Sequence, residues 1–351
     1  MNPRRQPPNP PIVIPASTEH PVGQHGSQPF IAADVGGTHA RLGLVHVRPG
    51  GKVDVLAYHR YVCAEFPSLA AIVDDFAKTH GADRTHVVVA IAGRLEGDNL
   101  INANLQWPVS VERTRREAGI AHFALLNDFE AVACAMPYID VDAMTRVCGP
   151  LQAGEGPALV LGPGTGFGAS LCLPRTLTQG VPLRVLASEA GHAALAVGSP
   201  REMALLARLL QRWPHVDNER VLSGPGLVNT YVALCELDGV VPKLDSPEAI
   251  ATAAQTGIDA QALESLQLFC SLLGSLAGDL AVTFGADAVY LAGGIPAQIR
   301  PFLLESDFAQ RFLNKGVLGE VLARVPVWLV DHGQLGLVGA AAWYYERHSG
   351  F

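Results

Sequence analysis

Three glycine-rich turns in the chain could bring backbone amides close to a phosphate. The first, Asp34-Val35-Gly36-Gly37-Thr38, also supplies a carboxylate and a hydroxyl, and the others are Gly164-Thr165-Gly166 and Gly293-Gly294. Glycine has no Cβ, so its N–H can approach an anionic ligand without obstruction. Taken alone, each turn fits an ordinary hairpin or strand end better than a phosphate site.

Polar side chains in the middle of the chain could bind and activate a polyol. Asn127-Asp128 ends a buried apolar stretch, where Asp128 would act as a general base or belong to a helix cap. Glu189, His192 and Glu219 could together donate to and accept from neighbouring hydroxyls of a sugar. The Glu-x-x-His spacing also occurs in di-iron bundles, but the sequence has no second copy of it, so a metal role is not predicted.

Other chemistries are disfavoured by the sequence. Gly164-x-Gly166-x-x-Ala169 fits a permissive dinucleotide-binding pattern, but residues 171–173 predict a strand where that pattern must open a helix. The sequence lacks the G-x-x-x-x-G-K-[ST], H-E-x-x-H, G-x-S-x-G and D-F-G motifs. We therefore expect neither a covalent nucleophile nor a zinc centre.

The elements that would position these residues show a repeated pattern. A strand, a glycine turn and a strand are predicted over 30–47 and again over 158–173, which favours two similar halves of mixed α/β type. Ser110 and Ser223 are predicted helix N-caps, and Gly285 is a predicted C-terminal cap. Further strands are predicted over 53–61, 87–92, 124–126, 288–292 and 325–330, and helices over 67–80, 109–119, 129–135, 200–213, 224–237, 247–255, 259–284 and 337–345.

Length and composition narrow the class of protein. The 351 residues favour two domains, and 17% are charged against roughly 25% in typical domains, which favours buried sheets. A net charge of −8 without a cluster of Lys and Arg disfavours nucleic acid as a partner. Six scattered cysteines favour a reduced, cytoplasmic location. Residues 1–29 predict a disordered, proline-rich tail, and neither a signal peptide nor a membrane span is predicted.

In chain order, the motifs resemble the bacterial glucokinase family, within the hexokinase and actin-like superfamily. The resemblance implies a two-domain hexokinase/actin-like fold, in which each domain is built on a ribonuclease H-like mixed sheet and the ligands lie in the cleft between them. The small domain would comprise 30–137 and 335–351, and the large domain 138–334. The segments that carry the resemblance are 34–42, 126–129, 164–166, 189–192, 219–227 and 291–295, of which 219–227 is the most specific.

The resemblance also implies an activity, the transfer of the γ-phosphate of ATP to O6 of glucose, which positioning and electrostatics can accelerate. Asp128 would take the proton from the attacking hydroxyl, and Asp34 would lie near Mg²⁺, with water between them. The resemblance further implies a homodimer. The other sugar hydroxyls would be held by Asn104, Asn127, Glu189, His192 and Glu219, and the nucleotide would contact Gly36, Gly37, Thr38, Gly164, Thr165, Gly166, Gly293 and Gly294.

The sequence departs from the family pattern at a few positions. His39 stands where an asparagine is common beside the first turn, and a protonated imidazole there would add a cationic contact to phosphate. Ala190, Pro163 and the segment 332–336 also differ. Two alternatives stay open: a sensor that binds sugar without phosphorylating it, and a kinase for another hexose or an amino sugar. The tail 1–29 is too short to hold the helix-turn-helix that regulators of related folds usually carry.

Overall fold

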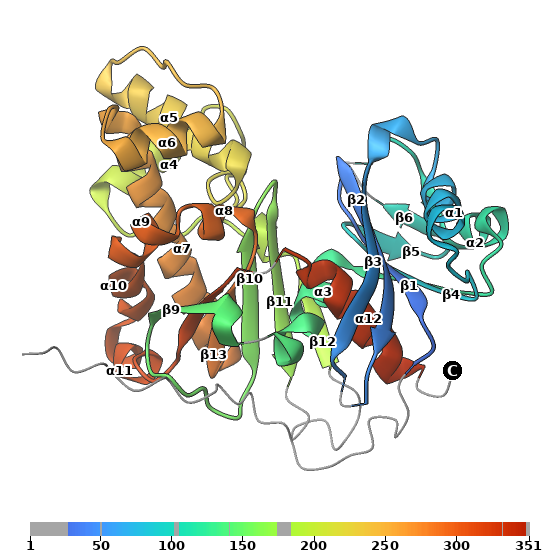
Figure 1. Ribbon diagram of the computed structural model, residues 1–351. Coiled ribbons are helices and arrows are strands. Elements are labelled where there is room, and N and C mark those ends of the chain that lie inside the picture. The colour runs from blue at the N-terminus through green and yellow to red at the C-terminus, as the bar shows by residue number, and fades with distance from the viewer. Residues whose placement is uncertain are drawn as a thin grey trace, which may run out of the picture.

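The computed structural model describes residues 27–49, 51–101, 105–139, 141–173, 184–331 and 333–348. Two mixed sheets lie side by side, with helices between them and on their outer faces (Figure 1). Residues 1–26 of the predicted tail lie outside the described residues. The prediction that the tail extends to residue 29 is wrong, because Ser27 is 5% exposed and its Oγ accepts a hydrogen bond from the Val47 amide at 3.0 Å.

The first sheet begins with the predicted hairpin. Its strands have the order β3-β2-β1-β4-β8, in which β1, β2 and β3 are antiparallel neighbours and β1, β4 and β8 are parallel. Parallel neighbours need a crossover, and helices supply it. The strands are β1 (Phe30–Val35), β2 (His39–Val47), β3 (Val53–Val62), β4 (His86–Ile91) and β8 (His122–Asn127).

The second sheet repeats this order. Its sequence of strands is β12-β11-β10-β13-β14, with β9 added at the far edge as an antiparallel partner of β14. The repetition confirms the two similar halves and the mixed α/β fold that the sequence predicts. The strands are β9 (Met144–Cys148), β10 (Ala158–Pro163), β11 (Phe167–Leu173), β12 (Arg184–Ser188), β13 (Ala288–Leu291) and β14 (Val327–Val330).

Helix ends follow local capping chemistry. The Ser110 hydroxyl accepts from the amide of Arg113, the Ser223 hydroxyl accepts from that of Gly226, and Gly285 has φ 60°, so all three predicted caps are confirmed. The helices are α1 (Leu69–His80), α2 (Val111–Ala118), α3 (Asp128–Ala135), α4 (Pro200–Leu209), α5 (Gly224–Asp238), α6 (Pro247–Thr256), α7 (Ala260–Phe284), α8 (Gly294–Gln298), α9 (Arg300–Glu305), α10 (Phe308–Leu313), α11 (Gly319–Leu322) and α12 (Leu335–Arg347).

Two helices form the layer between the sheets. Helix α3 directly follows β8, and α12 packs along it, so that the two helices separate the sheets in Figure 1. Helix α12 turns Leu337, Ala340 and Tyr344 to the core of the first sheet, and Leu335 and Val338 to the core of the second. The last helix therefore joins both halves, although the domain limits at 137/138 and 334/335 stay predictions.

Some predicted limits are wrong. The helix that starts at Pro200 ends at Leu209 instead of 213, and the strand predicted from 325 begins at Val327. A small sheet of β5 (Arg94–Glu96), β6 (Asn99–Ile101) and β7 (Val109–Ser110) was not predicted. By length and composition alone, α7 could cross a membrane, but 72% of its most apolar window is buried inside the protein, as in a core helix.

Candidate active site

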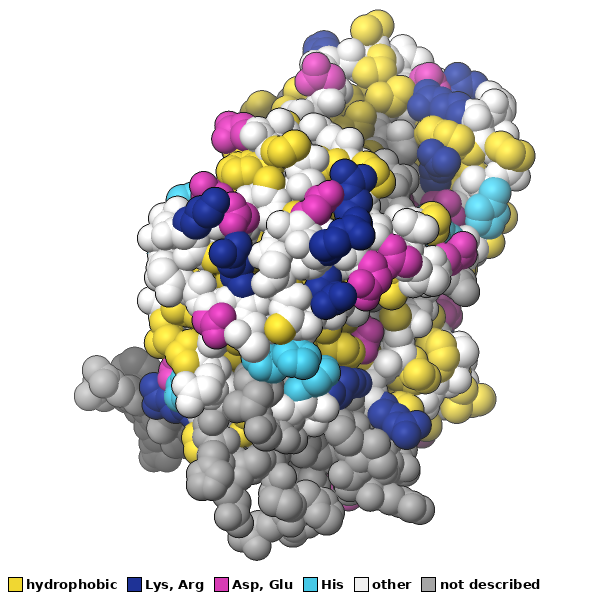
Figure 2. Space-filling model, turned by 90° about the vertical axis from the view of Figure 1, so that its right-hand side faces the viewer, with side chains coloured by type: hydrophobic (Ala, Val, Ile, Leu, Met, Phe, Trp, Pro, Cys, Tyr) yellow, Lys and Arg dark blue, Asp and Glu magenta, His cyan; other side chains and the backbone are white. Residues whose placement is uncertain are grey.

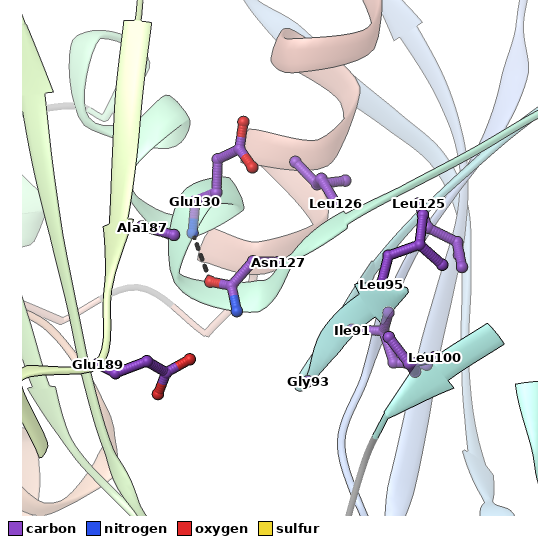
Figure 3. A pocket seen from close by; sticks show the side chains of 10 residues that line it. All are labelled: Ile91, Gly93, Leu95, Leu100, Leu125, Leu126, Asn127, Glu130, Ala187 and Glu189. Carbon is purple, nitrogen blue, oxygen red and sulfur yellow. Dashed lines mark hydrogen bonds between the residues drawn. The ribbon is translucent and has the colours of Figure 1, made fainter. Parts of the chain in front are cut away.

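A pocket of about 390 Å³ opens between β8, the small sheet and β12 (Figure 3). Asn127 at the end of β8 and Glu189 just after β12 supply polar groups from opposite sides, as Figure 3 shows. The remainder of the wall is mainly apolar, which fits the mixed lining of small-molecule sites. The lining residues are Ile91, Gly93, Leu95, Leu100, Leu125, Leu126, Asn127, Glu130, Ala187 and Glu189.

Asn127 and Asp128 stand where β8 passes into α3. The Asn127 Oδ1 accepts from the amides of Phe129 at 2.9 Å and Glu130 at 3.1 Å, so Asn127 is the N-cap of the helix. The Phe129 amide also donates to Asp128 Oδ1 at 2.9 Å. Capping and a role in the site are thus compatible, because Asn127 caps with its oxygen and still lines the pocket.

Asp128 lies in an environment that disfavours its charge. Burial raises the pKa of Asp128, the amide of Phe129 opposes that rise, and the nearby charges of Asp34 and Glu189 add to it. Asp34 belongs to the first glycine turn, and Glu189 directly follows strand β12 of the second sheet. Asp128 therefore lies near groups from both halves of the molecule. Asp128 does not itself line the pocket, but its neighbour Asn127 does. A carboxylate whose pKa is raised beside a pocket is a candidate general base.

Asp34 occupies the end of β1, where the first glycine turn begins. Arg41 Nη1 donates to Asp34 Oδ2 at 3.2 Å, and 22% of the Asp34 side chain is exposed. Burial raises the pKa of Asp34, and Arg41 opposes this rise. Helix α12 also approaches this carboxylate, since a Cβ at Gly336 would lie 2.7 Å from Asp34 Cγ. Gly336, at the end of the altered segment, therefore borders Asp34.

His39 lies near two arginine side chains that disfavour its protonation. Arg60 Nη2 lies 3.0 Å from His39 Nε2 and can donate to it. Desolvation lowers the pKa of His39, and the charges of Arg60 and Arg41 lower it further. Both effects disfavour the protonated imidazole that could contact phosphate as a cation, and that contact stays a prediction.

The second and third glycine turns lie against each other. The Gly164 amide donates to the Gly166 carbonyl at 2.8 Å in the turn between β10 and β11. Gly293 has φ 105°, and a Cβ there would lie 2.7 Å from the carbonyl oxygen of Pro163. Glycine is therefore required at 293 both by the backbone conformation and by this close approach. Gly294 beside it has no heavy atom within 4 Å of an added Cβ.

Glu189, His192 and Glu219 are brought together by a pairing of two loops. The Glu219 amide donates to the Gly191 carbonyl at 2.9 Å, and Glu189 Oε2 lies 4.0 Å from His192 Nε2. The Glu219 carboxylate accepts from the Phe167 amide at 2.8 Å, so it lies at the second glycine turn. The His192 and Glu189 side chains are 63% and 77% exposed, which leaves them accessible to a ligand.

Sequence reasoning missed several groups at the site. Asp217 Oδ2 lies 3.7 Å from His192 Nδ1, and its Oδ1 accepts from the Arg220 amide, so a carboxylate fixed by the backbone lies beside the imidazole. Its place two residues before Glu219 was a usable signal. The apolar wall of Leu95 and Leu100 had no such signal, because it depends on the unpredicted small sheet. Asn104, expected to bind sugar, lies outside the described residues.

Comparison with known proteins gives a consistent result. The family model described as Glucokinase matches residues 31–347. A glucokinase-like protein of Xylella fastidiosa strain 9a5c is 45% identical over 91% of this chain and 95% of its own length. A glucokinase of Chromobacterium violaceum is 37% identical over 90% of this chain and 88% of its own length.

Solved structures show the same fold. A glucokinase from an Antarctic psychrotroph is 33% identical, with a TM-score of 0.79, over 90% of this chain and 98% of that chain. A glucokinase from Streptomyces griseus of the ROK family, in complex with glucose and AMPPNP, is 21% identical with a TM-score of 0.58 over 90% of this chain and 99% of that chain.

Proposed function

Because the chain belongs to the glucokinase family, we propose that it transfers the γ-phosphate of ATP to O6 of glucose and releases glucose 6-phosphate and ADP. The observation that carries the chemistry is the position of Asp128. This carboxylate lies at the first turn of α3, beside the pocket, with Asp34 and Glu189 close enough to influence its pKa.

Asp128 acts as the general base in this proposal. It accepts the proton of the O6 hydroxyl as that oxygen attacks the γ-phosphorus, and the bond from that phosphorus to the β,γ-bridging oxygen breaks. Asn127, Glu189, His192 and Glu219 bind the other hydroxyls, together with Asn104 by resemblance. Hydrogen bonds to several hydroxyls hold O6 in line with the phosphate. The free energy of sugar binding is thus used to keep the reacting atoms in the geometry that the transfer needs.

The glycine turns bind the nucleotide in this proposal. Backbone amides of Gly36, Gly37 and Thr38, and of Gly164, Thr165 and Gly166, approach the phosphates, whereas Gly293 and Gly294 approach the adenosine. The adjacency of the second and third turns supports this division. The Streptomyces griseus structure holds glucose together with AMPPNP, an ATP analogue.

Asp34 suits a magnesium ion bound with ATP. Mg²⁺ is usually held by one or two carboxylates, by waters and by substrate phosphates. Asp34 is a single, partly exposed carboxylate beside a proposed phosphate turn, and the described residues contain no cluster of three or more potential ligands. The donor set thus fits an ion that ATP brings with it, which would neutralise charge on the transferred phosphoryl group.

A coupled assay of ADP release tests the substrate. We expect release to depend on sugar and to be fastest with glucose among glucose, mannose, fructose and N-acetylglucosamine, with a control without sugar. Faster release with another sugar would support a kinase for that sugar. Calorimetric binding of glucose without any ADP release would support the sensor.

Asp128→Asn tests the proposed base. We expect kcat to fall about 10²- to 10⁴-fold, the usual contribution of acid–base catalysis, while glucose still binds. Glu112→Gln, which removes an exposed carboxylate on α2, is the matched control and should keep full activity. Retained turnover in Asp128→Asn would refute the assigned role.

We also propose that the enzyme acts in the cytoplasm as a homodimer, without nucleic acid or membrane as a partner. The six cysteines are free thiols, which suits a reducing compartment. The homodimer rests on the family resemblance.

A further inference from the structure

Phe129, the residue after the proposed base, reaches from α3 into the second sheet. Gly162 on β10 and Gly168 on β11 are directly paired across the hairpin. A Cβ at Gly168 would lie 1.9 Å from Phe129 Cδ2, and one at Gly162 would lie 2.1 Å from Phe129 Cζ. The aromatic ring therefore lies against bare backbone at this glycine pair, which we call the glycine notch.

The absence of side chains at Gly162 and Gly168 makes room for the Phe129 ring. Neither Gly162 nor Gly168 has a positive φ, so their backbone conformation does not require glycine. Glycine inside a strand costs roughly 0.5–1 kcal/mol relative to alanine, and such a cost needs a compensating contact. At Gly168, the three nearest atoms to an added Cβ all belong to the Phe129 ring.

The backbone of Phe129 holds the proposed base. Its amide donates to Asp128 Oδ1 at 2.9 Å and also to the N-cap oxygen of Asn127 at 2.9 Å. Phe129 is thus tied to the carboxylate through its main chain and to the β10–β11 hairpin through its side chain.

The hairpin carries a proposed phosphate turn. Gly164, Thr165 and Gly166 lie between the two residues of the glycine notch in the chain. The distance from Asp128 to the Gly164–Gly166 turn consequently depends on how the Phe129 ring packs in the glycine notch. A base and a phosphate contact that come from different halves must be aligned closely, because small misplacements cost large factors in rate.

We infer that Phe129 is a positioning residue for phosphoryl transfer: with its ring in the glycine notch, it holds Asp128 in register with the Gly164–Gly166 turn. The inference rests on the proposed function. Phe129 touches no reacting atom in this role and acts through Asp128 and the hairpin.

A double-mutant cycle on kcat tests the inference. We expect Gly168→Ala and Phe129→Ala each to lower kcat more than tenfold, with a smaller change in KM for glucose. The double variant should be no slower than the slower single variant, because both changes break the same contact. Phe66→Ala, at another half-buried phenylalanine, is the control and should leave kcat unchanged.

The outcomes separate the inference from the proposed function. If the wild-type protein phosphorylates glucose but the two single effects multiply in the double variant, or either single variant keeps its kcat, the inference is wrong. A wild-type protein without sugar kinase activity would overturn the proposed function and the inference with it. If Gly168→Ala does not fold, the test is Phe129→Leu, whose kcat should lie between those of the wild type and Phe129→Ala. A kcat of Phe129→Ala equal to that of the wild type, or a kcat of Phe129→Leu equal to that of Phe129→Ala, would overturn the inference.

Discussion

Asp128 combines two requirements that oppose each other. A base must be ionised to accept a proton, yet burial and the charges of Asp34 and Glu189 raise the pKa of Asp128. A higher pKa also makes the carboxylate a stronger proton acceptor once it is ionised. The acidic surroundings therefore strengthen the base but narrow the pH range in which it works.

The pH dependence of kcat should reveal this balance. Because turnover needs ionised Asp128, activity should be lost as pH falls through its raised pKa, at a higher pH than for an ordinary aspartate. Glu189→Gln removes one of the charges that raise this pKa. We expect the acid limb of kcat, measured at saturating glucose and ATP, to move to lower pH in that variant.

Glu112→Gln again serves as the control. Glu112 lies on the exposed side of α2, so its substitution should leave the acid limb of kcat at the same pH. An unshifted limb in Glu189→Gln would show that another group limits the rate in acid.

The residues of the site were predicted unevenly. Strand ends followed by Asn-Asp or glycine could be found because the polar residue directly follows an apolar run. Asp217 follows no predicted strand, so its place two residues before Glu219 was its signal in the sequence. Its contact with His192 could not be predicted, because that contact depends on a pairing of two loops. Likewise, Gly162 and Gly168 could not be linked to the site from the sequence, because their contact is with the ring of Phe129, which is distant in the chain.

At the scale of elements, helices α3 and α12 approach each other very closely. A Cβ at Gly339 would lie 1.6 Å from the carbonyl oxygen of Ala131. The pair is further joined where Trp343 Nε1 donates to Glu130 Oε1 at 2.8 Å. A main-chain oxygen cannot rotate away from such an overlap, so the helices can pack this closely only with glycine at 339.

Gly339→Ala should therefore destabilise the protein. Alanine favours a helix over glycine by about 1 kcal/mol, but overpacking against backbone typically costs about 1–3 kcal/mol or more. We expect a net loss in the free energy of unfolding, measured by urea denaturation. Gly333→Ala, where an added Cβ meets nothing within 4 Å, should change it by less than about 0.5 kcal/mol. Equal stability of the two variants would contradict this account.

Element prediction succeeded where local signals are strong. Serine caps, the left-handed Gly285 and long apolar faces identify helices α2, α5 and α7 without any tertiary information. The small sheet failed because β5, β6 and β7 have only two or three residues each, too few for a period to appear. Strand β9 was not predicted either, because it is defined by its pairing with β14, which is far along the chain.

At the scale of the whole molecule, charge is spread and paired. Figure 2 shows Lys and Arg interspersed with Asp and Glu over the face that carries α2. Pairs such as Arg113 with Glu117 at 2.8 Å and Arg115 with Glu112 at 3.0 Å belong to this helix. With a net charge of −8, the protein as a whole does not attract an anionic nucleotide.

Nucleotide binding should consequently depend little on salt. Backbone amides and the Mg²⁺ of the nucleotide act at short range, where screening over a Debye length of about 10 Å at 0.1 M has little effect. We expect the KM for MgATP to change by less than about threefold between 0.05 and 0.3 M KCl, measured at saturating glucose. A steep rise in KM would instead indicate that side-chain cations such as Arg41 and Arg60 supply the affinity.

The position of α12 has a consequence for the order of folding during synthesis. The first sheet is made early, but the helix that covers one of its faces through Leu337 and Tyr344 is the last element in the described chain. At ~5–20 residues per second, a ribosome needs roughly 10–40 seconds to make the second sheet in between. During that time, one face of the first sheet stays uncovered. Most helices that pack on the second sheet, by contrast, are synthesised together with its strands. We therefore expect the half that begins later to be completed first, and chaperones to meet the nascent chain at the exposed face of β1, β2 and β4.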